Sequence, residues 1–318
     1  MKLILEKNSD ILNLKSHSLI KTFYEKEQLE ILSFEEIKNY LLENKNNTIN
    51  IFFYIYINWN FGFDLINFLK NDYQKQKPNI FVFTDDYWNT GSNIKYLNSI
   101  FKTNNCYQVI HQCPNLDILK KYTKSITIDK KNLIFNPFWC CYDSSYLPEN
   151  NNVINKLLVS GRTWEKIYQE RFLISKIKGT KILNYQNIEM TKINFDSFKN
   201  YFNNINNDYA KELNKYLACF SSSVYNTHCI LLKTFEILAV GSLLVMPKHE
   251  EEFLKKIGLI NMHNCWLINF NKDLQKQVDK ILHPRKRYLV DAIRRNGHQH
   301  AIKYLNSEKK FLEISQLI

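Results

Sequence analysis

Glycine is scarce in this sequence, and the motifs that depend on glycine are absent. Only 7 of the 318 residues are glycine, far below the usual share of about 7%. Neither G-x-G-x-x-G nor G-x-x-x-x-G-K-[ST] occurs, so the main signatures of dinucleotide oxidoreductases and P-loop nucleotide hydrolases are missing. G-x-S-x-G and H-E-x-x-H are also absent, which removes the signatures of α/β-hydrolases and zinc proteases. The few glycines are expected at positions that need a freer backbone.

Cysteine pairs and long apolar runs are lacking as well. The 7 cysteines show no C-x-x-C spacing, so we expect neither a disulfide framework nor a zinc site. The expected compartment is therefore a reducing one. No run of about 18 uncharged apolar residues occurs, because Lys233 and Glu236 interrupt the most apolar stretch, residues 229–246. The first apolar run is too short for a signal peptide. We therefore predict a cytoplasmic protein without a membrane span.

Acidic residues are fewer than basic residues in this sequence. Lys+Arg number 43 against 31 for Asp+Glu, which gives a formal net charge of +12. Lysine, asparagine and isoleucine are abundant while glycine is rare, a bias typical of the AT-rich genome of a microbe or of a large DNA virus. Part of the positive charge is therefore expected to reflect codon usage. The alternative is a nucleic-acid-associated protein, whose affinity would fall steeply with salt.

The length and the apolar content predict two folded domains. One hydrophobic core rarely serves more than ~250–300 residues, and a hydrophobic fraction of 45% argues against disorder. The segment 136–152 contains two prolines and an asparagine run, as interdomain connections often do. We place the boundary there, which gives an N-terminal domain of residues 1–148 and a C-terminal domain of residues 149–318.

Strand-like and helix-like segments alternate in both halves, which is the pattern of α/β domains with a parallel sheet. Continuous apolar runs predict strands that are buried on both faces. Residues 51–57, 80–83 and 243–246 are such runs, and residues 107–110 and 156–160 are predicted as further strands. Each half is therefore predicted to be a Rossmann-like unit.

Several helix boundaries follow from capping residues. Residues 33–36, Ser-Phe-Glu-Glu, have the spacing of a capping box that opens a helix. Gly179 is expected to end a helix over residues 165–178. In the same way, Gly297 is expected to end a helix over residues 284–296.

The most specific motif covers residues 233–247, KTFEILAVGSLLVMP. Lys233 and Glu236 open a predicted helix that ends at Gly241, before a strand. The motif resembles the nucleotide-sugar-binding segment of GT-B glycosyltransferases, especially the CgeB-like group related to spore-maturation and spore-coat enzymes. The resemblance implies that Glu236 binds the donor's ribose hydroxyls and that Lys233 faces its diphosphate, with Thr234 included in the donor site; a helix N-terminus favours an anion. The alternative is an amphipathic helix with a surface Lys–Glu pair.

The segment before this motif differs from many retaining GT-B enzymes. They carry a further glutamate where this chain has His228, so the role of that glutamate toward the sugar is not transferred. Residues 221–228, SSSVYNTH, still supply hydroxyls and backbone amides suited to phosphate oxygens. Asn226, Thr227 and His228 therefore join the predicted donor site. A structural role is the alternative for His228.

A second match to the same family covers residues 157–162, LLVSGR, and residues 168–171, YQER. In the family, a strand ends here in a glycine-containing turn and is followed by a helix that carries Tyr and Arg. Sugar transfer leaves a diphosphate whose developing charge must be stabilised, and GT-B enzymes generally use basic side chains and a helix dipole for this. The resemblance implies that Gly161, Arg162 and Arg171 bind the donor and that neither a metal nor another cofactor is needed. A structural ion pair is the alternative for Arg171.

Candidate catalytic residues lie in the first half. Asp85 and Asp86 follow the predicted strand 80–83, and a carboxylate at the carboxyl edge of a sheet can deprotonate a sugar hydroxyl. His111 is the further candidate for this acceptor-side role. Two acids without a third ligand are a weak signal for a divalent cation. The alternative for each aspartate is a cap of the next helix or turn.

The densest basic run, residues 283–298, resembles the C-terminal pattern of the family, which has His-Pro, a charged helix and Gly. Its charges are interleaved with Tyr288, Leu289, Ala292 and Ile293 at helical spacing. We therefore interpret it as a solvated helix face and not as a nucleic-acid surface. The last helix is expected to cross back to the first domain, as in relatives.

The resemblance covers residues 133–305, and the first half fits by its order of strands and helices. It implies a GT-B glycosyltransferase, with two Rossmann-like α/β domains whose parallel sheets face a central cleft. The donor would be a nucleoside-diphosphate sugar, of UDP or GDP, and the acceptor a glycan or another hydroxyl compound. The alternative is a non-catalytic α/β binding protein, either a degenerate GT-B or a nucleic-acid-associated basic protein.

Overall fold

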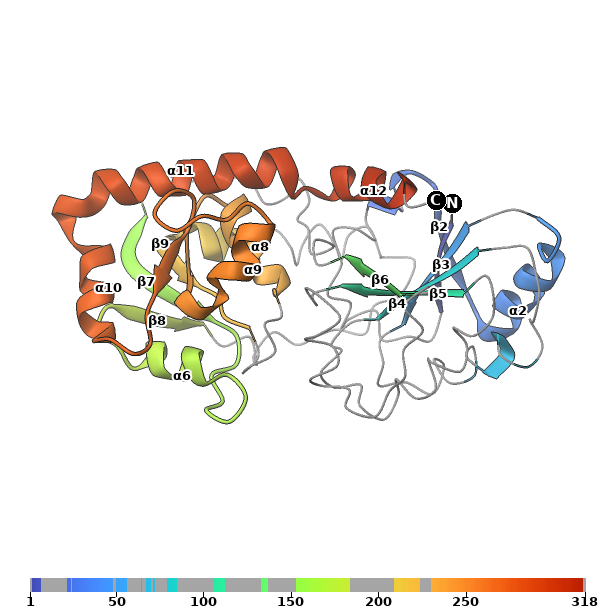
Figure 1. Cartoon of the computed structure of the whole chain (residues 1–318), viewed down its shortest axis with the longest axis horizontal. Helices are drawn as coiled ribbons and strands as arrows, with labels where there is room; N and C mark the ends of the chain where they lie inside the picture. The colour runs from blue at the N-terminus through green and yellow to red at the C-terminus, as the bar shows by residue number, and fades with distance from the viewer. Residues whose placement is uncertain are drawn as a thin grey trace. The chain divides into compact units, whose positions relative to one another are not determined.

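The computed structural model divides the chain into two compact units (Figure 1). Unit 1 is Met1–Trp139 together with Lys310–Ile318, and unit 2 is Cys140–Lys309. The division lies between residues 139 and 140, whereas the sequence prediction placed the boundary after residue 148. The structure describes residues 2–6, 22–23, 25–47, 50–55, 64, 67–69, 71, 79–84, 106–111, 133–136, 153–183, 209–223 and 230–316. Within these stretches, no helix is long and apolar enough to cross a lipid bilayer.

Unit 1 is built on a six-stranded sheet with the order β2-β1-β3-β4-β5-β6. Neighbouring strands pair in parallel. The strands are β1 (Lys2–Glu6), β2 (Leu29–Leu32), β3 (Asn50–Ile55), β4 (Asn79–Thr84), β5 (Cys106–His111) and β6 (Leu133–Asn136). The strands predicted at residues 51–57, 80–83 and 107–110 are confirmed as β3, β4 and β5. The strand order reverses between β1 and β3, as in Rossmann-like sheets.

Helix α2 (Phe34–Glu43) begins with the predicted capping box. The backbone N–H of Glu36 donates to Ser33 Oγ at 3.4 Å, and the backbone N–H of Ser33 donates to Glu36 Oε2 at 2.7 Å. Ile37 and Leu41 are fully buried and pack the helix into unit 1. The local sequence therefore determines both where this helix begins and which face it buries.

The C-terminal helix α12 (Ser307–Gln316) contributes its residues from Lys310 onward to unit 1. The ring of Phe311 meets the ring of Phe23 edge-on, with 4.8 Å between the centroids. Phe23, Phe311 and Ile314 are all buried. An aromatic pair of this kind adds about 0.5–1.5 kcal/mol to the burial itself. The last part of the sequence therefore belongs to the core of unit 1.

Unit 2 has a five-stranded parallel sheet with the order β11-β10-β9-β7-β8. Its strands are β7 (Ile154–Ser160), β8 (Thr180–Leu183), β9 (Tyr216–Phe220), β10 (Leu243–Pro247) and β11 (Trp266–Ile268). β9 and β10 are buried along their whole length, as continuous apolar runs predict for central parallel strands. The strands expected at 156–160 and 243–246 are confirmed as β7 and β10.

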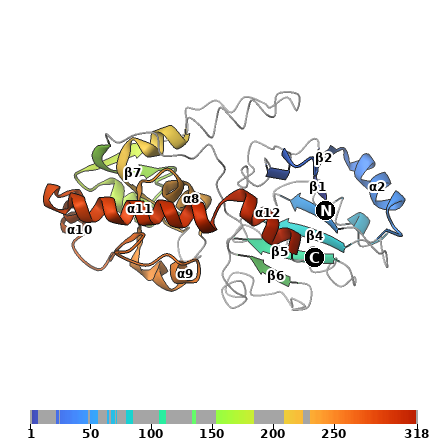
Figure 2. The same cartoon turned by 90° about the horizontal axis from the view of Figure 1, so that it is seen from above.

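Helices cover the unit 2 sheet from both sides. In Figure 1, α6 and α11 lie on opposite sides of the strands, and Figure 2 shows α11 running past α8. The core between sheet and helices includes Phe220, Val245, Val278 and Ile293. The helical segments are α6 (Gln169–Ser175), α8 (Leu232–Ala239), η6 (Lys248–Glu250), α9 (Glu251–Lys256), α10 (Leu274–Leu282), η7 (Pro284–Lys286) and α11 (Arg287–Tyr304).

Several helix ends differ from the prediction. α6 ends at Ser175, with Lys176 as its C-cap, and not at residue 178 before Gly179. α6 begins at Gln169 and not at residue 165, because the backbone of Tyr168, with φ −124° and ψ 54°, is outside the helical region. Gly297 does not end a helix but lies inside α11. A Cβ at this position would come within 2.7 Å of the carbonyl oxygen of Asn264. Gly297 is therefore needed for the close approach of α11 to the loop before β11.

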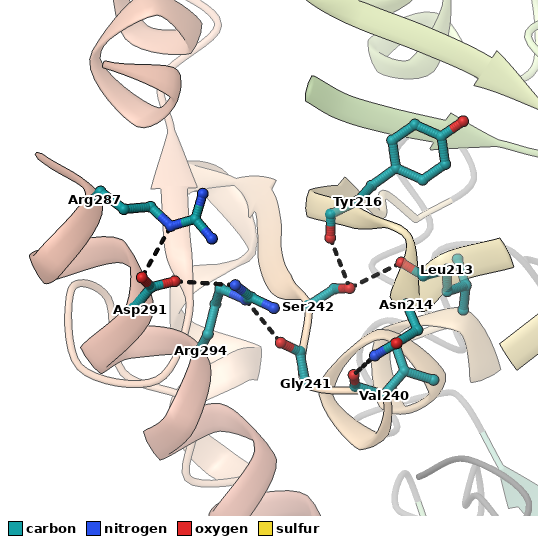
Figure 3. A network of polar contacts seen from close by, with 9 residues as sticks. All are labelled: Leu213, Asn214, Tyr216, Val240, Gly241, Ser242, Arg287, Asp291 and Arg294. Carbon is teal, nitrogen blue, oxygen red and sulfur yellow. Dashed lines mark hydrogen bonds and ion pairs between the residues drawn. The ribbon is translucent and has the colours of Figure 1, made fainter. Parts of the chain in front are cut away.

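A set of polar contacts fixes the turn between α8 and β10 (Figure 3). The guanidinium of Arg294 donates from Nε to the carbonyl oxygen of Gly241 at 2.8 Å. Ser242 Oγ donates to the carbonyl oxygen of Leu213 at 2.9 Å, and Asn214 Nδ2 donates to the carbonyl oxygen of Val240 at 2.6 Å. Backbone oxygens around the turn thus obtain donors from α11 and from the segment before β9.

The basic run is partly neutralised within α11 itself. Asp291 accepts from Arg287 Nε at 2.9 Å and from Arg294 NH1 at 3.0 Å. Tyr288 is 84% exposed while Ile293 is buried. These positions confirm the interpretation of the run as a helix with one solvated face.

Candidate functional site

Two chain segments meet at the carboxyl edge of the unit 2 sheet. β7 lies between β8 and β9. The chain therefore adds β8 on one side of β7 and the later strands on its other side. Ligands of open α/β sheets bind at such a switch point. Gly161 directly follows β7, and residues 221–223 directly follow β9. The ligand chemistry of unit 2 is therefore expected at this edge.

Three predicted donor-site residues come together there. Gly161 has a φ of +91°, and a Cβ added to it would lie 2.8 Å from Lys233 Nζ and 3.5 Å from Arg171 NH1. The ammonium group of Lys233, from the first turn of α8, donates to the carbonyl oxygen of Ser160. Arg171 NH2, from α6, donates to the carbonyl oxygen of Ser222 at 3.2 Å. Two cations from different helices thus flank the glycine turn, and we call Arg171 and Lys233 the cation pair.

Arg171 of the cation pair is buried, and Lys233 is half-buried. Arg171 is 4% exposed, and its Nε has no hydrogen-bond acceptor among the residues that the structure describes. Neither Arg171 nor Lys233 takes part in an ion pair with another of these described residues. A buried charge without a counter-ion is unfavourable. This arrangement therefore favours an anionic ligand.

Burial and mutual repulsion also change the proton affinity of the pair. Burial lowers the pKa of Lys233 well below its ordinary value of 10.5, the charge of Arg171 lowers it further, and Glu236 opposes the shift. Burial likewise lowers the pKa of Arg171. A bound anion would act in the opposite direction, because it favours the charged forms.

Glu236 and Thr234 occupy different parts of α8. Glu236, one turn after Lys233, is 8% exposed, whereas Thr234 is fully buried. The Thr234 hydroxyl lies 3.2 Å from Ser221 Oγ and 3.8 Å from Met246 Sδ. The structure therefore places Thr234 in contact with the segment after β9, behind the cation pair.

The two predicted arginines have distinct surroundings. The guanidinium of Arg162 lies 4.6 Å from the centroid of the exposed Trp164 ring. That of Arg171 lies 4.3 Å from the centroid of the Tyr168 ring, which forms a cation–π contact. Arg171 thus shares the buried site with Lys233, while Arg162 stacks at the surface. Tyr168 stands three residues before Arg171 in the sequence, and this short spacing could have indicated the contact.

The other predicted site residues cannot be placed in the same way. Asp85, Asp86, Asn226, Thr227 and His228 lie outside the described residues. His111 is the last residue of β5, and the structure describes its backbone only. Ser222 was predicted only as part of the segment 221–228, and its carbonyl oxygen is the acceptor for Arg171. Among the described residues, no group of His, Cys, Asp and Glu side chains could hold a metal ion.

Three solved structures have a similar fold, and two of them were solved with UDP-glucose. HepE of Anabaena, in complex with UDP-glucose, is 10% identical with a TM-score of 0.64 over 100% of this chain and 99% of its own. An α-glucosyltransferase in complex with UDP-glucose and DNA is 12% identical, with a TM-score of 0.60 over 99% of this chain and 98% of its own. Sucrose-phosphate synthase of Thermosynechococcus elongatus is 9% identical, with a TM-score of 0.62 over 100% and 98%.

These neighbours define the class of fold. The chain has the GT-B fold, with two Rossmann-like α/β units that each contain a parallel sheet. At identities of 9–12%, the likeness establishes the fold alone. The sequence matches no protein-family model and gives no significant match among curated protein sequences. The narrower resemblance to the CgeB-like group stays a prediction.

Proposed function

We propose that this protein is a glycosyltransferase that moves a sugar from a nucleoside-diphosphate sugar to a hydroxyl group of an acceptor. The observation that carries the proposal is the cation pair, a buried arginine and a half-buried lysine beside the glycine turn at the switch point of the unit 2 sheet. A diphosphate supplies the charge that this site lacks. The fold neighbours support this choice of ligand, since HepE and the α-glucosyltransferase were both solved with UDP-glucose.

In this proposal, Arg171 and Lys233 bind the diphosphate and Glu236 accepts hydrogen bonds from the ribose hydroxyls. Bond cleavage at the anomeric carbon leaves negative charge on the nucleoside diphosphate, and fixed cations stabilise that charge in the transition state. Gly161 keeps a side chain out of the space that the Lys233 ammonium occupies. Because the two cations supply positive charge at the leaving group, we propose that transfer needs no metal ion.

The remaining donor and acceptor roles rest on sequence. Asn226, Thr227 and His228, which continue the segment after β9, complete the donor site, and Arg162 binds at its exposed rim. Asp85, Asp86 or His111 of the first unit acts as the base that deprotonates the acceptor hydroxyl. The acceptor is a glycan or another hydroxyl compound in the cytoplasm, and the narrower kinship is with the CgeB-like group.

Ligand-induced stabilisation tests the donor site. UDP, GDP and their sugar conjugates are added to the full chain, and the melting temperature is recorded. A ligand at 100 times its Kd stabilises by about 2.7 kcal/mol, which corresponds to several degrees in a protein of this size. Glu236→Ala should abolish the shift, and Glu252→Ala, which removes a carboxylate that is 84% exposed on α9, should preserve it.

The outcomes separate the proposed function from its alternatives. A wild-type protein that responds to none of these nucleotides would overturn the proposal. Binding without release of UDP or GDP from the sugar conjugate, with or without acceptor, would instead indicate a degenerate GT-B protein. Affinity for nucleic acid that falls steeply with salt, in the absence of nucleotide binding, would indicate the nucleic-acid-associated alternative.

A further inference from the structure

A second polar cluster lies at the same edge of the unit 2 sheet. His249 Nε2 is 3.5 Å from Glu170 Oε1 and 3.4 Å from Glu250 Oε1. Ser223 Oγ donates to the same Oε1 atom of Glu250. Glu170 and Glu250 are 8% and 2% exposed, whereas the side chain of His249 keeps 44% of its surface accessible. One imidazole thus lies between two buried carboxylates.

This cluster is connected to the cation pair at both ends. Glu170 and Arg171 are consecutive residues of α6. At the other end, Ser223 follows Ser222, whose carbonyl oxygen accepts from Arg171. Contacts and peptide bonds therefore form a closed ring through α6, the segment after β9 and η6. Its members are Glu170, Arg171, Ser222, Ser223, Glu250 and His249, and we call it the histidine ring.

The ring brings two carboxylates close to each other in the protein interior, and this is unfavourable unless a positive charge compensates. Glu170 Oε2 is buried without a hydrogen-bond partner among the described residues. Burial raises the pKa of Glu170, and the charge of Glu250 adds to the shift while His249 and Arg171 oppose it. An imidazolium between the two acids would attract both and hold α6 against η6.

We propose that His249 is a positioning residue of the nucleotide site: its imidazolium holds Glu170 and Glu250 together and thereby fixes Arg171 and the serine segment 222–223 for the diphosphate. The inference rests on the proposed function, because it assigns the ring a task at the proposed donor site. It adds a residue that does not touch the cation pair and that the sequence motifs do not include.

The charge on His249 makes the arrangement dependent on pH. The hydrogen bond with Glu250 raises the pKa of His249 above its ordinary value of 6.5, and the charges of Glu250 and Glu170 act in the same direction. Among the described residues, the charged groups that act on His249 are Glu170 from α6 and Glu250 from its own segment η6. A raised histidine pKa stabilises the folded state fully below about pH 6.5, and this contribution is lost as the pH rises through the folded-state value.

Glu170 acts in the same sense. Because its pKa is raised, the folded state favours its protonated form, and its ionisation at higher pH removes stability. The ring should therefore loosen as the pH rises above the ordinary histidine value. Affinity for the nucleotide should fall with it.

The test is the pH dependence of UDP-glucose binding by the full chain. Both phosphates of UDP-glucose are esterified, so the charge of the ligand stays constant near neutral pH. Affinity is measured by calorimetry from about one unit below to about two units above the ordinary histidine pKa. We expect the wild-type affinity to fall about tenfold more across this range than the affinity of His249→Gln does. The glutamine side chain can still form hydrogen bonds, but it does not gain or lose a proton. Titration of Lys233 is common to both proteins and cancels.

Two further variants make the comparison specific. Glu250→Gln removes the largest cause of the raised histidine pKa, so its affinity should begin to fall at lower pH than that of the wild type. His263→Gln replaces an exposed histidine on the loop before β11 and should keep the wild-type profile. Superimposable pH profiles of the wild type and His249→Gln would overturn the inference.

Failure of the proposed function would be seen separately. If the wild type binds UDP-glucose at no pH, the donor-site proposal fails for this nucleotide, and urea unfolding of the same variants then tests the ring. The wild type should lose stability as the pH rises through the histidine range, and His249→Gln should lack that step. Equal pH dependence of unfolding in both proteins would overturn the ring as well.

Discussion

Two pairs of basic side chains in unit 2 have opposite electrostatic surroundings. Arg287 and Arg294 of α11 share one carboxylate, that of Asp291, at 2.9 and 3.0 Å. Arg171 and Lys233 flank the turn at Gly161, and within the described chain neither of them forms an ion pair. The ion pairs of Arg287 and Arg294 stabilise the fold. The unpaired charges of Arg171 and Lys233 make folding less favourable unless an anion is bound. Residue type alone therefore does not show which basic residues bind a ligand.

The largest expected effect comes from removing one member of the cation pair. Lys233→Met should weaken UDP-glucose binding by about 100-fold or more, since loss of a buried charged hydrogen-bond partner costs about 2–5 kcal/mol. Without ligand, the variant should be as stable as the wild type or more so, because the remaining buried cation loses a like-charged neighbour. Calorimetry and urea unfolding in the same buffer measure the two quantities.

Arg287→Met is the matched control in the paired region. It removes a cation that shares Asp291 with Arg294 and should leave the affinity for UDP-glucose unchanged. If Arg287→Met weakens binding as much as Lys233→Met does, the contrast between the two pairs is wrong. If Lys233→Met keeps the wild-type affinity, the cation pair is not the diphosphate site.

A smaller effect is expected at the glycine turn between the cations. Gly161→Ala would place a Cβ 2.8 Å from Lys233 Nζ at a φ of +91°. Such a backbone costs about 1–3 kcal/mol for a residue with a side chain, so both the free energy of unfolding and the affinity should fall. Gly258→Ala is the control, because Gly258 also has a positive φ, +74°, but faces His300. It should lower stability without changing the affinity, and an equal loss of binding would contradict the prediction.

The smallest effect is expected in the paired region. Arg294→Met leaves the carbonyl oxygen of Gly241 without this donor and leaves the carboxylate of Asp291 with Arg287 alone. Loss of these contacts, at a side chain that is 13% exposed, should lower the free energy of unfolding by about 1–3 kcal/mol. Chemical denaturation measures this change, and calorimetry should show wild-type affinity for UDP-glucose. A weaker affinity would indicate that the turn between α8 and β10 also supports the donor site.

Most of the secondary structure of the described sheets could be predicted because the signals are local. Continuous apolar runs gave β3, β4 and β10, and the spacing of Ser33 and Glu36 gave the start of α2. Gly297 shows the limit of this reasoning. A glycine with a charged helix before it looks like a C-cap, whereas its cause is the approach of a carbonyl oxygen from Asn264. That contact joins distant parts of the sequence, so no local pattern contains it.

The sequence indicated which residues belong to the candidate site but not how their side chains are arranged. Gly161, Arg171 and Lys233 are all in the segments that resemble GT-B enzymes, and the structure brings them together. Arg162 belongs to the same motif, yet its guanidinium stacks on Trp164. His249 had no motif at all, because its partners come from α6 and from its own helical segment η6. Its position follows only from the packing of these elements at one edge of the sheet.

The placement of residues 310–318 in unit 1 has a consequence for how the protein is made. Chains are synthesised from the N-terminus, and domains usually fold in that order. Here the ring of Phe311, which packs on Phe23, leaves the ribosome only after all of unit 2 has been translated. Unit 1 must therefore wait with part of its apolar surface uncovered, and a chain interrupted before residue 310 would expose that surface permanently.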